Sequence, residues 1–527
     1  MRTLAFFLLV ALSGILGGSA WAQPAAPERP RDDEFIRVAP DQWGFEGADT
    51  HRRFIPLGSN LVLTTKEDLD MFGPRYEEAR YDGILAACEG VNITLLKVFL
   101  QLSSVLPDPQ TPGEVHITPG YFENLENFLG LCKKHHLRAE VSLACWGGNG
   151  CQWWQDGGQY FGRKPWKTGA GIDSLDILCR FWTALATRFR DNPAIFSYSP
   201  CVEWSLPNTN LTWFAPNGYS PTVQSDVGRW YWRAWLKAKY GSIDKLNAAW
   251  GTALPGFDDI TLADYAYDGA RKCYADPEQK IFDYSNFREW TTNRYFRPQL
   301  AAIRAASPRH LTTISNHMRF WDLWEGGAQH FLGATPFEQK PFVDYLTLHE
   351  NFSESENVPN RTDADILHTV EVLARFCAVG KPMPIILEEF SYSARDPKRV
   401  ADMQAAIVRT TKGHLSGWTT WYLQDPSNPV IGADATTDRA IETSWLDADL
   451  KPTPWGLAAK QIFEEFSMAD LGRIPPKEIV PLDRRQSLVP KEAATVLRHR
   501  QQYDAFPHPI DYTAPHEADL DLRLDGE

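Results

Sequence analysis

This sequence has few cysteines, no long hydrophobic run after its N-terminus and no excess of basic residues. Eight cysteines in 527 residues are too few for a disulfide scaffold, and no Cys/His cluster has the spacing of a zinc site. After the N-terminus, no stretch reaches the roughly 18 apolar residues of a membrane helix. The formal net charge is −14, from 67 acidic and 53 basic residues, and such a surface repels phosphate backbones. We therefore expect no nucleic-acid partner and no membrane span in the mature chain.

Apolar and aromatic residues, by contrast, are plentiful. Hydrophobic residues make up 43% of the chain and charged residues 23%, which predicts a large folded core and excludes widespread disorder. There are 20 Trp residues, and each buried Trp needs a partner for its indole N–H. The length allows roughly two to four domains, or one barrel enlarged by long loops.

The N-terminus has the order of a secretory signal peptide. Arg2 supplies a basic charge, residues 4–15 are nearly all apolar, and Ala20–Trp21–Ala22 fits the small-x-small cleavage rule. The alternative is a short membrane anchor, but the apolar run is short and no stop-transfer charges follow it. We expect residues 1–22 to be removed after Ala22, a linker at 23–40, and a secreted or periplasmic protein.

Strand-like and helix-like segments alternate over the next 400 or so residues. We predict strands at 54–63, 92–100, 138–145, 194–203, 311–315, 342–349, 384–389 and 415–423. Helices are predicted at 76–89, 121–136, 175–190, 228–240, 243–250, 284–306, 364–379, 400–411 and 455–466. Eight such units favour an α/β fold, a (β/α)8 TIM barrel with long βα loops over residues 41–470. An open doubly wound sheet is the alternative, weakened by the lack of a GxGxxG turn. Residues 471–527 are expected to form an extended tail with one helix near 491–502.

Carboxylates stand at two of the predicted strand ends, where barrel enzymes place their active sites. The fourth strand ends in Glu203 and the seventh in Glu388–Glu389. Two carboxyl groups about 5–5.5 Å apart perform retaining glycoside hydrolysis, one as acid/base and the other as nucleophile. Because side chains alternate along a strand, only one of the adjacent Glu residues is expected to face the site. A glutamate at a strand end can also be a salt-bridge partner.

Aromatic and polar side chains gather at the same strand ends. Flat indole faces in an open cleft suit the C–H faces of sugar rings, although a buried Trp can equally be core packing. His349 likewise has a core interpretation. The candidates for substrate binding are Lys97, Trp146, Trp204, Asn208, Asn316, His349 and Trp421.

These motifs resemble the clan A glycoside hydrolases, and glycoside hydrolase family 5, with its cellulase and β-mannanase relatives, most closely. Residues 191–203, from Asp-Asn-Pro-Ala to Glu203, are similar to the fourth-strand acid/base signature, and residues 385–390 to the seventh-strand signature with Glu389 as nucleophile. His349 matches the sixth-strand histidine, and Trp421 the eighth-strand tryptophan beside the scissile bond. Residues 235–251 are similar to a stretch of family 42 β-galactosidases. The resemblance covers about residues 40–465.

Two positions depart from that family pattern. The family has Asn directly before the acid/base, where it binds the sugar 2-hydroxyl, but this chain has Val202. The second-strand Arg that supports the nucleophile corresponds to Lys97, which keeps the charge and loses the bidentate fork. Asn208 and Asn316 are candidates to replace the missing amide.

The sequence and the resemblance together predict a secreted retaining β-glycosidase acting on a poly- or oligosaccharide. Glu203 is expected to be the acid/base and Glu389 the nucleophile, with carbohydrate as the partner and no metal or organic cofactor. One alternative is a catalytically inactive carbohydrate-binding barrel, motivated by Val202 and Lys97. The other is a metal-dependent barrel hydrolase, which needs His or carboxylate ligands converging on one point.

Overall fold

The computed structural model describes residues 29–61, 70–144, 151–164, 171–204, 226–264, 267–268, 273–316, 333–353, 362–378, 381–423, 443–469, 471–475, 478–481, 510–513 and 524. Its centre is a parallel sheet of eight strands joined in the order β10-β7-β6-β5-β4-β13-β12-β11. These strands are β4 (Leu57–Asn60), β5 (Leu95–Gln101), β6 (Arg138–Ala144), β7 (Ile195–Ser199), β10 (Leu311–Thr312), β11 (Leu346–Ser353), β12 (Ile385–Ser393) and β13 (Gly417–Thr420). Each of the eight predicted strands is present.

Hydrogen bonds also join the two ends of this sheet. The backbone N–H of Asp344 donates to Thr312 O at 2.8 Å, and Thr313 Oγ1 donates to Tyr345 O at 2.8 Å. The fifth and sixth barrel strands are therefore neighbours, and the sheet curls around on itself. The predicted (β/α)8 barrel is confirmed, and the open-sheet alternative is wrong.

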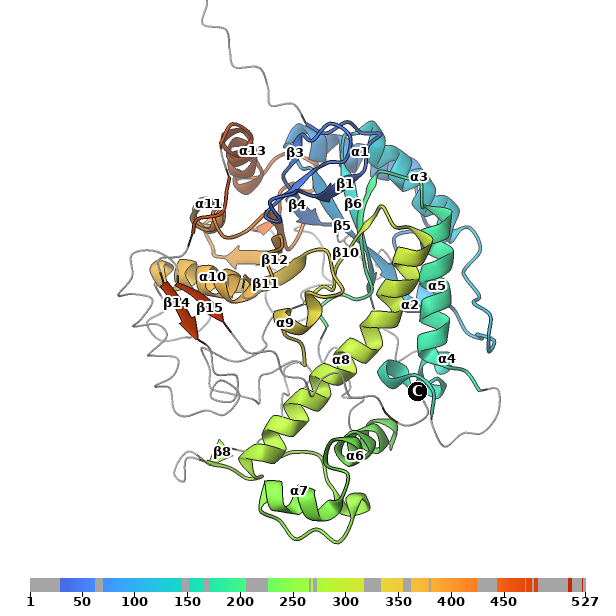
Figure 1. Cartoon of the computed structure of the whole chain (residues 1–527). Helices are drawn as coiled ribbons and strands as arrows, with labels where there is room; N and C mark the ends of the chain where they lie inside the picture. Colours follow the sequence, from blue (N-terminus) through green and yellow to red (C-terminus); the bar gives the residue numbers. More distant parts are fainter. Residues whose placement is uncertain are drawn as a thin grey trace, which may run out of the picture.

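Helices follow most of the strands and surround the barrel (Figure 1). They are α1 (Glu78–Gly90), α3 (Tyr121–Lys134), α5 (Ser174–Arg188), α8 (Glu278–Ala306), α10 (Asp363–Cys377), α11 (Pro397–Thr411) and α13 (Pro454–Ser467). Three of these helices have a short polar N-cap residue: Asp173, Asp396 and Thr453 accept hydrogen bonds from the N–H groups of the first turn. Short segments lie between these elements: α2 (Leu102–Val105), α4 (Gln152–Asp156), α9 (Pro336–Gln339) and the hairpin β8 (Tyr267–Asp268)–β9 (Cys273–Tyr274).

A lobe of helices lies at one end of the long helix α8 (Figure 1). It contains α6 (Asp226–Tyr240) and α7 (Ile243–Trp250). Trp232 stacks on both Trp235 and Trp250, with ring centroids 5.9 and 6.2 Å apart, and also contacts Phe287 of α8. These three Trp residues form the core of the lobe, so part of the tryptophan excess is structural.

An antiparallel sheet from the N-terminal segment packs against the barrel. It consists of β1 (Ile36–Val38), β2 (Phe45–Gly47) and β3 (Arg53–Phe54). Ile36, Phe45 and Phe54 pack with barrel residues that include Phe196 and Tyr345. The predicted linker at 23–40 is therefore wrong at its C-terminal end, because Ile36 is a buried core residue.

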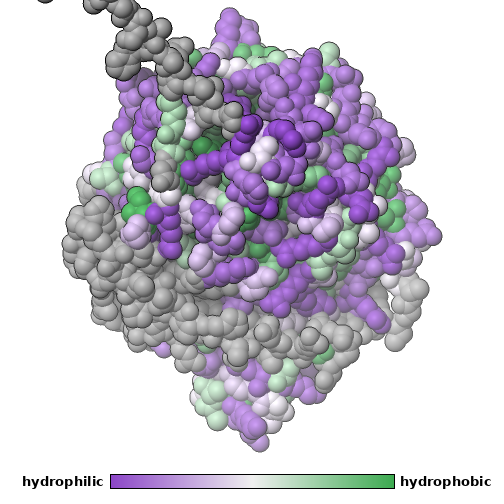
Figure 2. All heavy atoms as spheres, turned by 45° about the horizontal axis from the view of Figure 1, so that its top comes forward, coloured by the Kyte–Doolittle hydropathy of each residue, from purple (hydrophilic) through white to green (hydrophobic). Residues whose placement is uncertain are grey.

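The C-terminal segment also contains strands where an extended tail was expected. β14 (Glu478–Pro481) pairs in parallel with β15 (Ile510–Thr513). The expected helix near 491–502 and the signal peptide at 1–22 lie outside the described residues. In the described part of the chain, no helix is long and apolar enough to cross a membrane. Figure 2 shows mainly hydrophilic side chains on the face that carries α13, β3 and α1.

Candidate active site

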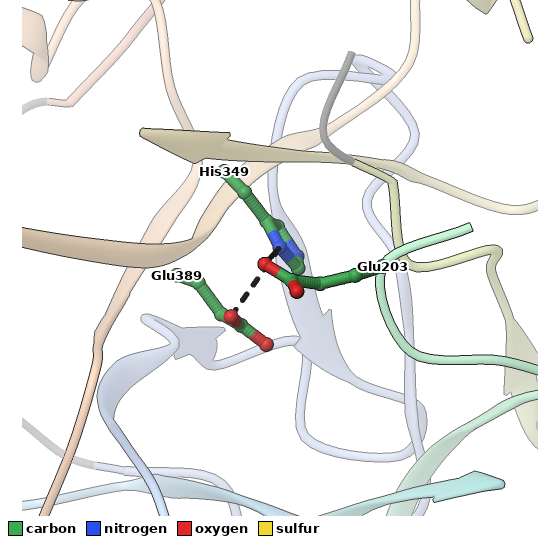
Figure 3. A group of neighbouring side chains, drawn as sticks. All are labelled: Glu203, His349 and Glu389. Carbon is green, nitrogen blue, oxygen red and sulfur yellow. Dashed lines mark hydrogen bonds and ion pairs between the residues drawn. The ribbon is translucent and has the colours of Figure 1, made fainter. Parts of the chain in front are cut away.

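Three side chains, two from barrel strands and one from the segment after a third strand, meet at one place (Figure 3). Glu203 follows β7, His349 lies on β11 and Glu389 on β12. His349 Nδ1 lies 3.4 Å from Glu203 Oε1 and 3.4 Å from Glu389 Oε2. One nitrogen and two carboxylate oxygens of this group lie within 4.8 Å of one another. The two carboxylates predicted from the sequence are thus adjacent, with an imidazole between them.

The backbone turns sharply at Glu203. Its φ is +50°, a left-handed conformation that non-glycine residues rarely adopt. Its neighbours on both sides, Val202 and Trp204, are buried, whereas the Glu203 side chain is 25% exposed. Trp204 also forms a β-bridge with Asn316. The buried neighbours therefore hold a strained residue whose carboxylate faces the site.

A bulge in β12 directs two adjacent carboxylates to the same place. The pairing of β12 with β11 advances from Leu387 directly to Glu389 and skips Glu388. Such an extra residue re-aims side chains and is common next to active sites. Both carboxylates contact Lys97, so the prediction that only one of them faces inward is wrong. Of the two, Glu389 lies beside Glu203, and Glu388 lies behind it against His349 Nε2.

Lys97 supports this carboxylate pair from β5. Its Nζ donates to Glu388 Oε2 at 2.9 Å, Glu389 Oε1 at 3.0 Å and Ser315 Oγ at 2.8 Å. The three N–H bonds of the ammonium group thus have three acceptors. Because Lys97 is fully buried, its predicted contact with substrate is wrong, and it acts on the carboxylates instead.

Burial and charge shift the pKa values of the central groups. Burial disfavours the charged imidazole of His349, but Glu389 and the hydrogen bonds to Glu203 and Glu388 raise its pKa to about 9. Burial raises the pKa of Glu389 above its usual range, while the charges of His349 and Lys97 oppose that rise. His349 is therefore a cation at neutral pH, next to a carboxylate that two cations stabilise.

Glu203, His349 and Glu389 also form the kind of group that can hold a metal ion. A metal needs the neutral imidazole nitrogen as its ligand. Here the raised pKa of His349 keeps Nδ1 protonated, and the Lys97 ammonium lies 3.0 Å from one candidate ligand. This charge distribution suits a protonated imidazole between carboxylates better than a divalent cation.

Trp421 is the described tryptophan best placed to contact a substrate. It follows β13, is partly exposed, and packs beside a buried apolar cluster formed by Phe99, Ala144, Val202 and Tyr422. Val202 thus belongs to an apolar surface next to the partly exposed indole. No side chain of this cluster replaces the amide that the resemblance led us to expect at that position.

Two other predicted contacts are not supported by the packing. The Trp204 indole stacks on Tyr295 with centroids 5.0 Å apart and donates to Thr292 Oγ1 at 2.8 Å. The Asn316 amide is buried and donates to Gln339 Oε1 at 2.7 Å. Both side chains are buried, so the packing does not support Trp204 or Asn316 as a substrate contact. Trp146 and Asn208 lie outside the described residues.

Three polar residues of the site were missed as candidates from the sequence: Ser315, Tyr345 and Glu140. Ser315 Oγ donates to Glu388 Oε2 at 2.5 Å, and Tyr345 OH donates to Glu140 Oε2 at 2.8 Å. Glu140 and Ser142 are polar residues two apart in strand β6, which begins at Arg138 and is apolar at its other positions. Such a pattern indicates a polar network on the inner face of a strand, and it could have identified Glu140 as a residue of the site from the sequence.

Comparisons with known proteins agree with this geometry. The model of a family described as β-galactosidase (glycoside hydrolase family 42) matches residues 176–394, which include Glu203, His349 and Glu389. A β-galactosidase of Arthrobacter sp. is 30% identical over 124 residues, 24% of this chain and 16% of that protein. The β-galactosidase BgaA of a Planococcus strain is 26% identical over 179 residues, 33% of this chain and 24% of that protein. The chain thus aligns with less than a quarter of the length of either relative.

Solved structures with the same fold include members of two glycoside hydrolase families. A β-galactosidase of Halorubrum lacusprofundi has a TM-score of 0.60 at 15% identity, covering 88% of this chain and 67% of that one. A family 42 β-galactosidase of G. stearothermophilus has a TM-score of 0.61 at 15% identity, covering 88% and 65%. A family 5 protein of Streptomyces cattleya, solved with Manβ1-4GlcNAc, has a TM-score of 0.53 at 14% identity, covering 89% and 96%. The predicted resemblance to clan A glycoside hydrolases, with features of families 5 and 42, is confirmed.

Proposed function

We propose that the protein is a retaining β-glycosidase that cleaves the O-glycosidic bonds of an oligo- or polysaccharide by double displacement. The observation that carries the proposal is the carboxylate pair of Glu203, which follows β7, and Glu389, which lies within β12; their nearest oxygens lie within 4.8 Å. Retaining enzymes hold their two carboxyl groups about 5–5.5 Å apart, whereas inverting enzymes leave about 6.5–9.5 Å for a water molecule. The short separation supports retention.

The surroundings of the two carboxylates support different roles. Glu389 is buried between two cations, His349 and Lys97, which suits an anion that attacks the anomeric carbon. Glu203 is 25% exposed, so it can give a proton to the leaving oxygen and then activate a water molecule. In this proposal Glu389 is the nucleophile and Glu203 is the acid/base, as the resemblance predicts.

The names of the relatives favour a β-galactoside as the first substrate to test. The matched relatives are named β-galactosidases, and the family model carries the same description. The partly exposed indole of Trp421, beside the pair, is proposed to stack on the sugar next to the scissile bond. Mannan, cellulose and xylan complete the panel, because the resemblance to family 5 also suggests polysaccharides.

Export is part of the same proposal. Residues 1–22 have the pattern of a cleaved signal peptide, and a secreted or periplasmic enzyme meets polysaccharide outside the cytoplasm. N-terminal sequencing of the exported protein should begin at Gln23. An uncleaved N-terminus on a cytoplasmic protein would contradict export without bearing on the site.

An inactive carbohydrate-binding barrel is the second candidate, and Val202 favours it. The side chain of Val202 cannot donate to a sugar hydroxyl, and it lies buried among apolar neighbours. Hydrogen bonds to the 2-hydroxyl contribute to catalysis in glycosidases. Binding of an oligosaccharide without turnover of any substrate of the panel would support this candidate.

The stereochemistry of hydrolysis tests the proposal. Proton NMR of the first product from an aryl β-galactoside should show the β-anomer, which later mutarotates. An α-anomer as the first product would contradict double displacement. The same assay with a chelator should show unchanged turnover, because the proposed mechanism uses no metal ion.

A further inference from the structure

Glu388 lies directly behind the proposed catalytic pair. Its Oε2 accepts from three donors on three strands or strand ends: Lys97 Nζ at 2.9 Å, His349 Nε2 at 2.7 Å and Ser315 Oγ at 2.5 Å. Burial favours the neutral acid, but the charge of Lys97 and the bond from His349 hold the pKa of Glu388 well below its usual range. Glu388 is therefore a buried anion that ties Lys97 to His349.

A second buried carboxyl group, that of Glu140, is hydrogen-bonded to Glu388. Burial, followed by the negative charge of Glu388, raises the pKa of Glu140 well above its usual range, so Glu140 is protonated. Glu388 Oε1 accepts no bond from an N–H or hydroxyl donor in the described part of the chain. The protonated carboxyl group of Glu140 is then the hydrogen-bond donor to Glu388 Oε1.

The charges of this buried cluster balance. In the proposed mechanism Glu389 is an anion before it attacks, so together with the anion Glu388 it balances the cations Lys97 and His349, while Glu140 is neutral. An unbalanced charge in a site without water is costly. If Glu388 were neutral, two cations would face the single anion Glu389, and His349 would lose its proton more readily.

We propose that Glu388 and Glu140 are positioning residues that keep His349 a cation through both halves of the glycosidase reaction. The inference rests on the proposed function. In the first half, a Glu389 oxygen bonds to the anomeric carbon, the bond to the leaving oxygen breaks, and Glu203 gives its proton to that oxygen. The negative charge thereby moves from Glu389, now an ester, to Glu203. His349 Nδ1 lies 3.4 Å from both, so one fixed cation serves each carboxylate in turn.

The second half returns the charge to its starting place. Water gives a proton to Glu203, its oxygen bonds to the anomeric carbon, and the ester bond to Glu389 breaks. The titratable groups around His349 are Glu203, Glu388 and Glu389, with Lys97 beyond them on β5 and Glu140 behind Glu388. Of these, Glu388 contacts the imidazole through the nitrogen that faces away from the reaction.

Three variants of the full-length protein separate this role from simple packing. Glu388→Gln removes the anion without changing its size, and kcat should fall about 10²-fold with a smaller change in KM. Glu140→Gln still donates to Glu388 through its amide, so kcat should fall less than in a variant without that donor. Glu140→Leu removes the donor and should lower kcat by about tenfold or more. Equal losses in Glu140→Gln and Glu140→Leu would overturn the role given to the proton of Glu140.

A measurement without substrate tests the effect on His349 itself. NMR of protein labelled with ¹⁵N-histidine reports the titration of each imidazole, and the His349 signal is the one absent from His349→Gln. In the wild type His349 should keep its proton up to a pH of about 9, and in Glu388→Gln it should titrate at lower pH. If Glu388→Gln does not fold, the titration of His349 is compared between Lys97→Met and Lys97→Met/Glu388→Gln. Because both lack Lys97, which itself lowers the pKa of His349, the loss of Glu388 should make His349 titrate at lower pH in the double variant.

The outcomes for the inference and for the proposed function are distinguishable. An active wild type with an unchanged His349 titration in Glu388→Gln would overturn the inference alone. A wild type that turns over no glycoside would overturn the proposed function and the reaction role built on it, whatever the NMR shows. Turnover by the wild type, with a lowered His349 titration and a lowered kcat in Glu388→Gln, supports both.

Discussion

Lys97 and Glu389 form a fully buried ion pair, with Nζ and Oε1 3.0 Å apart. The sequence suggested that a lysine here would be a weaker support than the arginine of related enzymes, because it lacks the bidentate fork. The bulge at Glu388 explains how a lysine can support the carboxylates here. It brings a second carboxylate within 2.9 Å of the same ammonium, so the point charge of lysine has two anions to hold.

Replacing Lys97 with Met should destabilise the protein and abolish activity. The change leaves two buried carboxylates without their ammonium, and removing one partner of a buried ion pair costs about 3–5 kcal/mol. Urea unfolding followed by circular dichroism measures this loss. Lys134→Met, in an exposed pair with Asp82, is the control and should leave the unfolding midpoint unchanged. Equal midpoints for Lys97→Met and the wild type would contradict the buried pair.

Replacing Glu203 with Ala should slow substrates with poor leaving groups far more than substrates with good ones. A dinitrophenolate leaves without protonation, so the first step survives and the slow step becomes attack by water. Added azide needs no general base and should restore the second step, giving a β-glycosyl azide whose anomeric configuration proton NMR identifies. An α-glycosyl azide, or equal losses with both kinds of leaving group, would rule out Glu203 as the acid/base.

Stability should depend on pH through His349. The pKa of His349 is raised to about 9 in the folded protein, against about 6.5 in an unfolded chain. Its contribution is then fully present below pH 6.5 and is lost as the pH rises through 9. The free energy of unfolding should fall over this range in the wild type and less steeply in His349→Gln. Parallel curves for the two proteins would contradict the raised pKa.

Replacing Trp421 with Ala should raise KM more than it lowers kcat. Its partly exposed indole packs beside the cluster that contains Val202, the residue before Glu203, and stacking on a sugar contributes to binding before and during the reaction. Trp204→Ala is the matched comparison, because that indole is packed against α8. It should lower the melting temperature instead. A change in melting temperature without a change in KM for Trp421→Ala would show that it too is only packing.

Much of the barrel could be predicted from sequence because most strands lie in short apolar runs that are followed by a helix. The strand at Arg138–Ala144 and the helix at Ile243–Trp250 lie almost where periodicity placed them. The small sheet β1–β3 was missed, because strands of two or three residues carry too little pattern. Only its packing on the barrel stabilises such short strands.

The residue types of the candidate site could be predicted from the sequence, but the directions of their side chains could not. Glu203 follows β7, and Glu389 lies at the predicted end of the seventh strand, which continues to Ser393 in the structure. Both are positions where chemistry was expected. The bulge that turns Glu388 inward is set by pairing with β11, which no local pattern in β12 records. Trp204 stands at the same strand end as Glu203, yet its indole packs against Tyr295, about 90 residues away in sequence. Long-range contacts of this kind separate a core tryptophan from a sugar platform.

Covalent labelling tests the central claim most directly. The mature protein is incubated with a 2,4-dinitrophenyl 2-deoxy-2-fluoro-β-galactoside, whose glycosyl-enzyme is hydrolysed slowly, and its peptides are mapped by mass spectrometry. If a wild type shown to be active on aryl β-galactosides gains one fluorosugar, and the label is on Glu389, the account holds. A label on Glu388 or Glu203, or turnover without any covalent adduct, would contradict it.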